Sequence, residues 1–193
     1  MKNKKVLVIL GGTSGERTVS LDSGKACVKA LKKKGYKVST FDPKKKNFSL
    51  IDKNKTDIIF NALHGKDGED GVAQSYFEYL RIPYTHSGVV SSYNAMNKLI
   101  SKQIFKQNKI YSPNYFILKK EDFNKVNLKN LIKLKKIKFP MVVKPINEGS
   151  SIGVKICKNF NSLNSNVKFL FKSYVELIFE PFIGGQEIQV AVI

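Results

Sequence analysis

The sequence predicts an α/β protein of two domains, in which a parallel sheet covered by helices precedes a mixed α+β part. Three observations lead to this prediction. Strand and helix patterns alternate over the first hundred residues. From Phe139 the order becomes strand, loop, strand, helix, strand, strand. The chain has 193 residues, 42% of them hydrophobic, which is enough for one ordinary domain or two small ones.

The first hundred residues justify the parallel sheet. The run "KVLVIL" predicts a strand that ends at Gly11-Gly12, and a helical pattern from Ser20 to Lys34 stops at Gly35. Ligands of such sheets gather at the carboxyl ends of the strands. Further elements are expected as strands at residues 36–41 and 57–63 and as a helix in "VAQSYFEYL".

The rest of the chain predicts the α+β part. Residues 91–108 have helical spacing, with an apolar face that contains Leu99 and Phe105. A Lys/Asn-rich surface segment at 119–138 follows, and we place the domain boundary near residue 100. The remaining elements are expected as strands at 139–143, 152–156, 175–179 and 187–193 and a helix at 162–174.

The composition excludes several function classes. The net charge of +19 suggests nucleic acid, but only Arg17 and Arg81 among the 34 basic residues are arginines, and the lysines are scattered. We therefore expect no nucleic-acid partner. No run is long enough to span a membrane, so no membrane partner is expected. Cys27 and Cys157 lack neighbours at metal-ligand spacing, which predicts free thiols and a cytoplasmic location.

The segment "KPINEGSSIGVK", residues 144–155, is richer than a hairpin turn requires. It offers backbone N–H groups, two hydroxyls and the ammonium of Lys144, which emerges from a buried strand and needs an anionic partner. These groups indicate a site for an anion. Lys98 and Lys102, one turn apart on a predicted helix, are by themselves expected to be solvated.

Two glycine-rich segments follow predicted strands. In "LGGTSGERTVS", the carboxylate of Glu16 suits a cationic ligand group, although an acid that complements the helix dipole is an alternative. In "NALHGKDGEDGVAQ", His64 and Glu69 lie among more glycines than a turn needs, although an exposed flexible loop is the alternative. In "VELIFEPFIGGQEIQV" a hairpin is the simplest interpretation, and Glu180 and Glu187 are potential acceptors for amino or hydroxyl groups of a flat heterocycle.

Together, "GGTSGERTVS", "ALHGKDGEDGVAQ", "IPYTHSG" with "AMNKLISK", "FPMVVKPINEGSSIGV" and "EPFIGGQEIQVAV" resemble the D-alanine–D-alanine ligases of the ATP-grasp superfamily, in order and spacing over essentially the whole chain. The resemblance implies a Rossmann-like substrate domain at residues 1–100. It also implies the first part of an ATP-grasp domain at residues 101–193, with the C-terminal part missing.

The resemblance implies that ATP phosphorylates one D-alanine and that a second displaces the phosphate, giving the D-alanyl-D-alanine of peptidoglycan precursors. Glu16 and Ser150 would be catalytic, and Glu16, His64 and Glu69 would bind substrate. Mg²⁺ or Mn²⁺ would be held by ligands beyond residue 193, with none in this chain, so we expect the 193-residue fragment to be inactive alone. The implied ATP-binding residues are Lys98, Lys144, Glu148, Gly149, Ser150, Ser151, Glu180, Pro181, Ile183 and Glu187.

The resemblance leaves alternatives open. The second substrate would be D-lactate or D-serine in a variant ligase, and a basic nucleic-acid-binding protein on the same fold is less favoured. The family commonly forms dimers, so a homodimer is expected. Two departures concern local geometry: His86 stands where the family usually has glycine, and Asn97 replaces the usual aspartate before Lys98.

Overall fold

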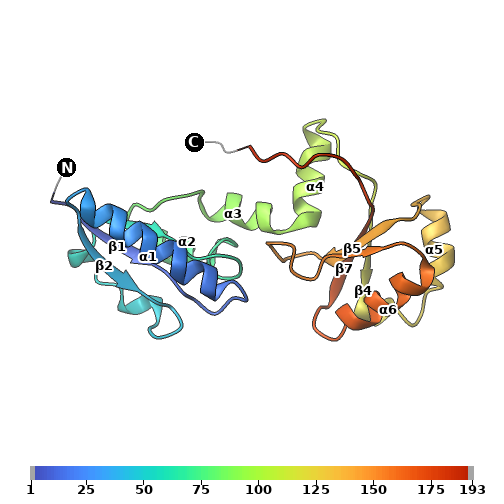
Figure 1. Cartoon of the computed structure of the whole chain (residues 1–193), viewed down its shortest axis with the longest axis horizontal. Coiled ribbons are helices and arrows are strands. Elements are labelled where there is room, and N and C mark those ends of the chain that lie inside the picture. The colour runs from blue at the N-terminus through green and yellow to red at the C-terminus, as the bar shows by residue number, and fades with distance from the viewer. Residues whose placement is uncertain (1–2, 191–193) are drawn as a thin grey trace. The chain divides into compact units, whose positions relative to one another are not determined.

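The structure is a computed structural model that describes residues 3–190, and the chain divides into two compact units (Figure 1). Unit 1 runs to Ser101 and includes Glu148–Ser150 of the later glycine loop. Unit 2 contains Lys102–Asn147 and the chain from Ser151 onward. The assignment of residues 1–100 and 101–193 to a substrate domain and an ATP domain remains a prediction.

Unit 1 contains a three-stranded parallel sheet in the order β2-β1-β3, as the alternation of strands and helices predicts. Successive side chains of a strand point to opposite faces. Accordingly, Val6 and Val8 of β1 join the apolar cluster that also contains Leu21 and Val28 of α1. Leu7 and Ile9 join the cluster on the other face, which contains Phe77 of α2. The elements are β1 (Lys5–Ile9), α1 (Arg17–Lys33), β2 (Lys37–Phe41), β3 (Ile58–Asn61), α2 (Val72–Tyr79) and α3 (Val89–Met96).

Unit 2 contains a four-stranded antiparallel sheet in the order β4-β7-β5-β6, with α5 and α6 packed on one face (Figure 1). Met141 and Val143 of β5 face these helices and are fully buried. The residues between them, Val142 and Lys144, therefore face the opposite side of the sheet. The elements are β4 (Phe116–Lys119), α5 (Leu128–Leu134), β5 (Met141–Pro145), β6 (Lys155–Cys157), α6 (Phe160–Leu170) and β7 (Glu176–Pro181). Helix α4 (Lys98–Gln107) begins in unit 1 and ends in unit 2.

The structure corrects several predicted elements. The helix predicted at 91–108 is two helices, because Asn97 is extended and its side chain caps α4 by accepting from the N–H groups of Leu99 and Ile100 at 3.0 and 3.1 Å. The substitution of the usual aspartate therefore preserves a cap. Strand β4 was not predicted. Its residues lie just before and at the start of the segment predicted to be on the surface, residues 119–138. The strand predicted at 187–193 is wrong over residues 187–190, which have no regular structure, and residues 191–193 lie outside the described residues.

Candidate active site

The first candidate site residue in unit 1, Glu16, lies directly before α1 in the loop after β1. It is only 9% exposed, and its side chain makes no capping hydrogen bond to the helix. Its carboxylate instead accepts a hydrogen bond from the hydroxyl of Ser150, which is 134 residues further along the chain. Gly65 makes room for this carboxylate, because a Cβ at that position would lie 2.6 Å from Glu16 Oε2. The structure thus brings the two predicted catalytic residues together.

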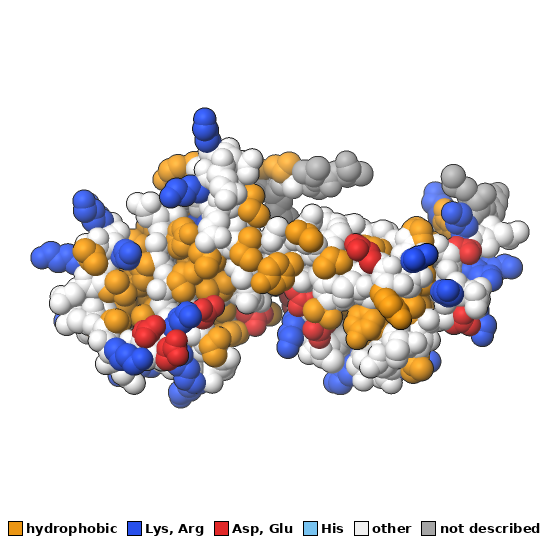
Figure 2. Space-filling model, turned by 180° about the vertical axis from the view of Figure 1, so that it is seen from behind, with side chains coloured by type: hydrophobic (Ala, Val, Ile, Leu, Met, Phe, Trp, Pro, Cys, Tyr) orange, Lys and Arg blue, Asp and Glu red, His pale blue; other side chains and the backbone are white. Residues whose placement is uncertain are grey.

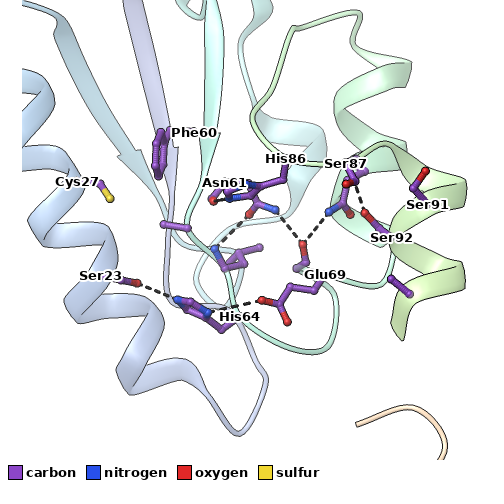
Figure 3. Close-up of a pocket in the computed structure, with 15 residues that line it drawn as sticks. Ser23, Cys27, Phe60, Asn61, His64, Glu69, His86, Ser87, Ser91 and Ser92 are labelled. Atoms are coloured by element: carbon purple, nitrogen blue, oxygen red, sulfur yellow. Dashed lines mark hydrogen bonds and ion pairs between the residues drawn. The ribbon is translucent and has the colours of Figure 1, made fainter. Parts of the chain in front are cut away.

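His64 and Glu69, in the loop after β3, also lie close together (Figure 3). His64 Nε2 lies 3.0 Å from the hydroxyl oxygen of Ser23, and His64 Nδ1 lies 3.6 Å from Glu69 Oε1. The Ser23 hydroxyl also lies 2.9 Å from the carbonyl oxygen of Val19, to which it can donate. Ser23 and Glu69 thus contact opposite nitrogens of the His64 imidazole and fix the orientation of the ring.

These side chains border a cavity of about 470 Å³, a volume typical of sites for small ligands. Asn61 and His86 line other parts of it (Figure 3). Gln74 also lines the cavity. His86 has a φ of +77°, a backbone conformation that favours glycine. This backbone conformation explains why glycine is the usual residue here in the family that the sequence resembles. The Nε2–H of His86 donates to the carbonyl of Asn61 at 2.9 Å, so the imidazole occupies its place with a partner.

An ion pair between Arg17 and Asp42, which was not predicted from the sequence, holds the glycine-rich loop after β1. The two terminal guanidinium nitrogens of Arg17 donate to the carboxylate of Asp42, at 2.9 and 2.7 Å, and Arg17 also donates to the carbonyl of Gly12. The Gly12 N–H donates to Asp42. The hydrogen bonds from Arg17 are the main cause that lowers the pKa of Asp42 from 3.8 to about 2.

Replacing Arg17 with leucine should therefore destabilise the protein near neutral pH. A depressed carboxyl pKa contributes stability above the unfolded value of 3.8, and this contribution is lost as the pH falls toward about 2. The melting temperature of the variant should be several degrees lower at pH 7, and the gap should narrow between pH 4 and pH 2. The control is Asp22→Asn, whose partner Lys25 is as exposed as Asp22 itself. A gap that stays constant with pH would mean that Arg17 acts through packing of its aliphatic stem.

The loop after β5 contains the predicted phosphate-binding residues. The Lys98 ammonium donates to the carbonyl of Glu148. Ser150 and Ser151 are exposed and have left-handed φ values of +45° and +59°, a conformation that costs about 1 to 3 kcal/mol per residue. Gly153 has a φ of +72°, and a Cβ there would lie 2.8 Å from Pro145, so only glycine fits.

Lys144 and Glu180 meet on the sheet of unit 2. Lys144 of β5 pairs with Ile178 of β7, so Glu180, two residues further along β7, lies diagonally on the same face. Lys144 Nζ lies 3.1 Å from Glu180 Oε2, and the carboxylate is one-tenth exposed. A second ammonium, that of Lys102, lies 3.3 Å from Glu180 Oε1. From the sequence, Lys102 was expected to be solvated.

The other residues predicted to contact ATP are less enclosed. Pro181 is the last residue of β7, and its carbonyl remains an acceptor. Ile183 is 62% exposed, and Glu187 is exposed in a segment without regular structure. Gly149 lies in the part of the loop after β5 that belongs to unit 1. A Cβ added to Gly149 would be 3.7 Å from Glu16 Oε2. The roles of these residues remain predictions.

Three contacts of the structure were not predicted: Arg17 with Asp42, Ser23 with His64 and Lys102 with Glu180. One residue of each pair has a sequence context that could have drawn attention to it. An arginine next to Glu16 in a glycine-rich segment, a serine nearly two turns into the following helix and a lysine among the apolar residues of a helix each stand out locally. Their partners could not be predicted, because Asp42, His64 and Glu180 lie 25, 41 and 78 residues away from Arg17, Ser23 and Lys102. The missed residues are Arg17, Ser23, Asp42 and Lys102.

Several bulk properties can be compared with their predictions. Cys27 and Cys157 are free, as predicted, and burial raises the pKa of the Cys157 thiol. On the face shown in Figure 2 the Lys and Arg side chains stand in small groups, several beside carboxylates, and do not form one patch. Within residues 3–190, no helix is long and apolar enough to cross a membrane. The same residues contain no cluster of three or more His, Cys, Asp or Glu side chains suited to a metal ion.

Two family models match the chain. One, described as "D-ala D-ala ligase N-terminus", matches residues 40–87, and the other, "D-ala D-ala ligase C-terminus", matches residues 104–193. A D-alanine–D-alanine ligase of Pelagibacter ubique is 53% identical over 98% of this chain and 61% of its own length. The crystal structure of the Bacillus anthracis ligase has a TM-score of 0.82 at 38% identity, covering 94% of this chain and 58% of that one. The structure of the Bacillus anthracis ligase complexed with ATP gives 0.77 at 33% identity, covering 94% and 60%.

The parallel sheet of unit 1 followed by the antiparallel sheet of unit 2 defines the class: an α/β protein with an ATP-grasp fold. Within that class, the chain belongs to the D-alanine–D-alanine ligase family. It spans about 60% of the length of the curated relatives that it matches. The family and fold inferred from the sequence motifs are therefore confirmed.

Proposed function

We propose that this chain carries the ATP-binding and first-substrate-binding residues of an ATP-dependent ligase that joins two D-alanines for peptidoglycan precursors. The proposal is supported most by one observation. Glu16 and Ser150, taken from motifs 134 residues apart, meet in unit 1 beside the loop that carries His64 and Glu69. Family membership and the names of the relatives support the same activity.

In the proposed reaction, the carboxylate of one D-alanine attacks the γ-phosphorus of ATP, the bond to ADP breaks, and D-alanyl phosphate forms. The amine of a second D-alanine then attacks the acyl carbon, and phosphate leaves. Glu16, an acceptor in a site only 9% exposed, would bind the ammonium of the first D-alanine. Its hydrogen bond from Ser150 would hold the carboxylate in the orientation required.

The positive groups would bind ATP. Lys98 and Lys144 would contact phosphate oxygens, and the loop from Glu148 to Gly153 would supply backbone donors. Preorganised charges of this kind account for much of the barrier reduction in phosphoryl transfer. The remaining groups proposed to contact the adenine and ribose are Glu180, Pro181, Ile183 and Glu187.

We also propose that the enzyme uses Mg²⁺ or Mn²⁺ with ATP. Such an ion would supply positive charge that neutralises the charge developing on the transferred phosphoryl group. Since residues 3–190 offer no cluster of His, Cys, Asp or Glu suited to such an ion, none of the steps above is assigned to it.

A cytoplasmic location and a homodimer complete the proposal. Cytoplasmic location is supported by the use of ATP and by two free thiols, which are typical of reducing compartments. A homodimer is supported by the resemblance of the sequence to a family that commonly dimerises. Light scattering of the purified protein at several concentrations would give twice the chain mass if this is correct.

Activity can be tested in the chain extended at its C-terminus with the portion of the Pelagibacter ubique relative that it does not match, called here the completed chain. Phosphate release should require both ATP and D-alanine, and D-alanyl-D-alanine should form in equal amount. Preferential incorporation of D-lactate or D-serine in mixed-substrate reactions would instead identify a variant ligase. Binding to an oligonucleotide that weakens steeply with salt, without dipeptide synthesis, would contradict the proposal.

A further inference from the structure

The buried residue of α4 is a lysine. The side chain of Lys102 is 9% exposed, whereas Leu99 and Phe105, which form part of the predicted apolar face, are more exposed than Lys102. Its ammonium donates to the hydroxyl of Ser112 at 2.7 Å and to the carbonyl of Pro113 at 3.1 Å. It also lies 5.1 Å from the centre of the Tyr115 ring. Two hydrogen bonds and a cation–π contact thus hold the ammonium of Lys102.

Glu180 stands between Lys102 and Lys144. Its Oε2 accepts from Lys144 at 3.1 Å, and its Oε1 lies 3.3 Å from Lys102 Nζ. Oε1 has no hydrogen bond of good geometry within the described part of the chain, so it interacts with Lys102 chiefly through charge. Two ammonium groups thus share one buried carboxylate, and the three charges sum to +1.

The two lysines are not equivalent. Lys102 is nine-tenths buried and also bonded to Ser112 and Pro113, whereas the side chain of Lys144 is 22% exposed. Both belong to unit 2, as does Glu180. An incoming anion therefore has better access to Lys144 than to Lys102.

This asymmetry solves an electrostatic problem. If Lys144 were the only partner of Glu180, its movement toward a phosphate would leave a buried carboxylate without a counter-ion, which is strongly unfavourable. With Lys102 in place, Glu180 keeps one cation while Lys144 changes partner. The carboxylate also continues to hold a fixed position on β7.

We propose that Lys102 is a positioning residue: it is the permanent counter-ion of Glu180, and it thereby allows Lys144 to exchange this carboxylate for the polyphosphate of the nucleotide. The inference rests on the proposed function, since it takes ATP as the ligand. Lys102 itself does not contact the nucleotide. It acts on binding only through Glu180.

The proposed role of Lys102 can be tested by asking whether a second substitution, at Glu180, restores the phosphate affinity that a substitution of Lys102 weakens. Inorganic tripolyphosphate is the probe, because it has no base or ribose, and its affinity for the completed chain is measured by titration calorimetry. Lys102→Met should weaken binding about ten-fold, within the range of coupling between neighbouring charges. Adding Glu180→Gln should restore the affinity to within about two-fold of wild type, since Lys144 is then released. Lys106→Met, an exposed lysine one turn further along α4, is the matched control.

If Lys102→Met/Glu180→Gln binds as weakly as Lys102→Met, Lys102 contacts phosphate or acts on the fold, and the proposal is wrong. If Lys102→Met does not fold by circular dichroism, the comparison is made in the Glu180→Gln background. There, adding Lys102→Met should leave the affinity unchanged, and a ten-fold loss would overturn the proposal.

The ligase assay of the completed chain separates this inference from the proposed function. Dipeptide synthesis without suppression means that the role of Lys102 is wrong and the function is right. Suppression without dipeptide synthesis supports the role of Lys102 and contradicts the ligase. Absence of any tripolyphosphate or ATP binding to the wild-type protein contradicts both.

Discussion

Replacing Lys144 with methionine should weaken ATP binding by about 2 to 4 kcal/mol, the scale on which a preorganised charged donor acts. Methionine keeps most of the length and apolar character of the stem but removes the ammonium. Lys144 lies on the β5 face opposite the apolar core, and the same strand places Met141 and Val143 in that core. The expected effect is therefore on nucleotide affinity and much less on packing.

The measurement is titration of ATP into the completed chain and into its Lys144→Met variant, with melting curves of both. Melting should change little, because Glu180 keeps Lys102 at 3.3 Å as a counter-ion. Lys158→Met, an exposed lysine just beyond β6, is the matched control and should bind ATP normally. Unchanged ATP affinity in Lys144→Met would show that the loop after β5 is not a phosphate site.

Replacing Glu16 with glutamine should lower kcat/KM for the first D-alanine by about 30- to 150-fold, which corresponds to about 2 to 3 kcal/mol for a charged partner lost in an enclosed site. Glutamine preserves size and one acceptor oxygen, so Ser150 can still donate to it. The charge that would face the ammonium is lost. ATP affinity should remain within about two-fold, because the lost interaction is not with phosphate.

The check is steady-state kinetics in the completed chain with D-alanine varied at saturating ATP, together with an ATP titration. Asp22→Asn, which neutralises an exposed acid of α1, is the control and should have normal kinetics. Equal losses toward ATP and D-alanine would favour the alternative that Glu16 serves the start of α1. Normal kinetics in Glu16→Gln would remove Glu16 from the substrate site.

Much of the fold followed from local patterns. Short β-branched runs that alternate with helical segments predicted the parallel sheet of unit 1, because parallel strands need helical crossovers. Helix boundaries shifted by a few residues, as at α1, which begins at Arg17 and not at Ser20. The break between α3 and α4 was missed because Asn97 is compatible with a helix interior pattern, whereas its capping geometry becomes visible only in three dimensions.

The candidate site was predicted less evenly. Glu16, His64 and Glu69 lie at the carboxyl ends of parallel strands, a place that topology specifies, and the structure finds them there. Lys144 and Glu180 were chosen separately, and their contact depends on the register of β5 against β7, which no local pattern contains. Arg17 with Asp42 is a similar case, since the pair joins two loops.

The sequence by itself determined the glycine-rich loops, the strands that lead into them and the family. These features depend on backbone sterics and hydrophobic periodicity, which act between near neighbours. Only the tertiary structure decided which lysine of α4 is buried beside Glu180. Helical spacing marks the faces of α4 but not the element that each face meets, and an ion pair between residues 78 positions apart forms only when distant segments pack together. Lys102 was therefore expected to be solvated, and it became a partner of β7 through packing within unit 2.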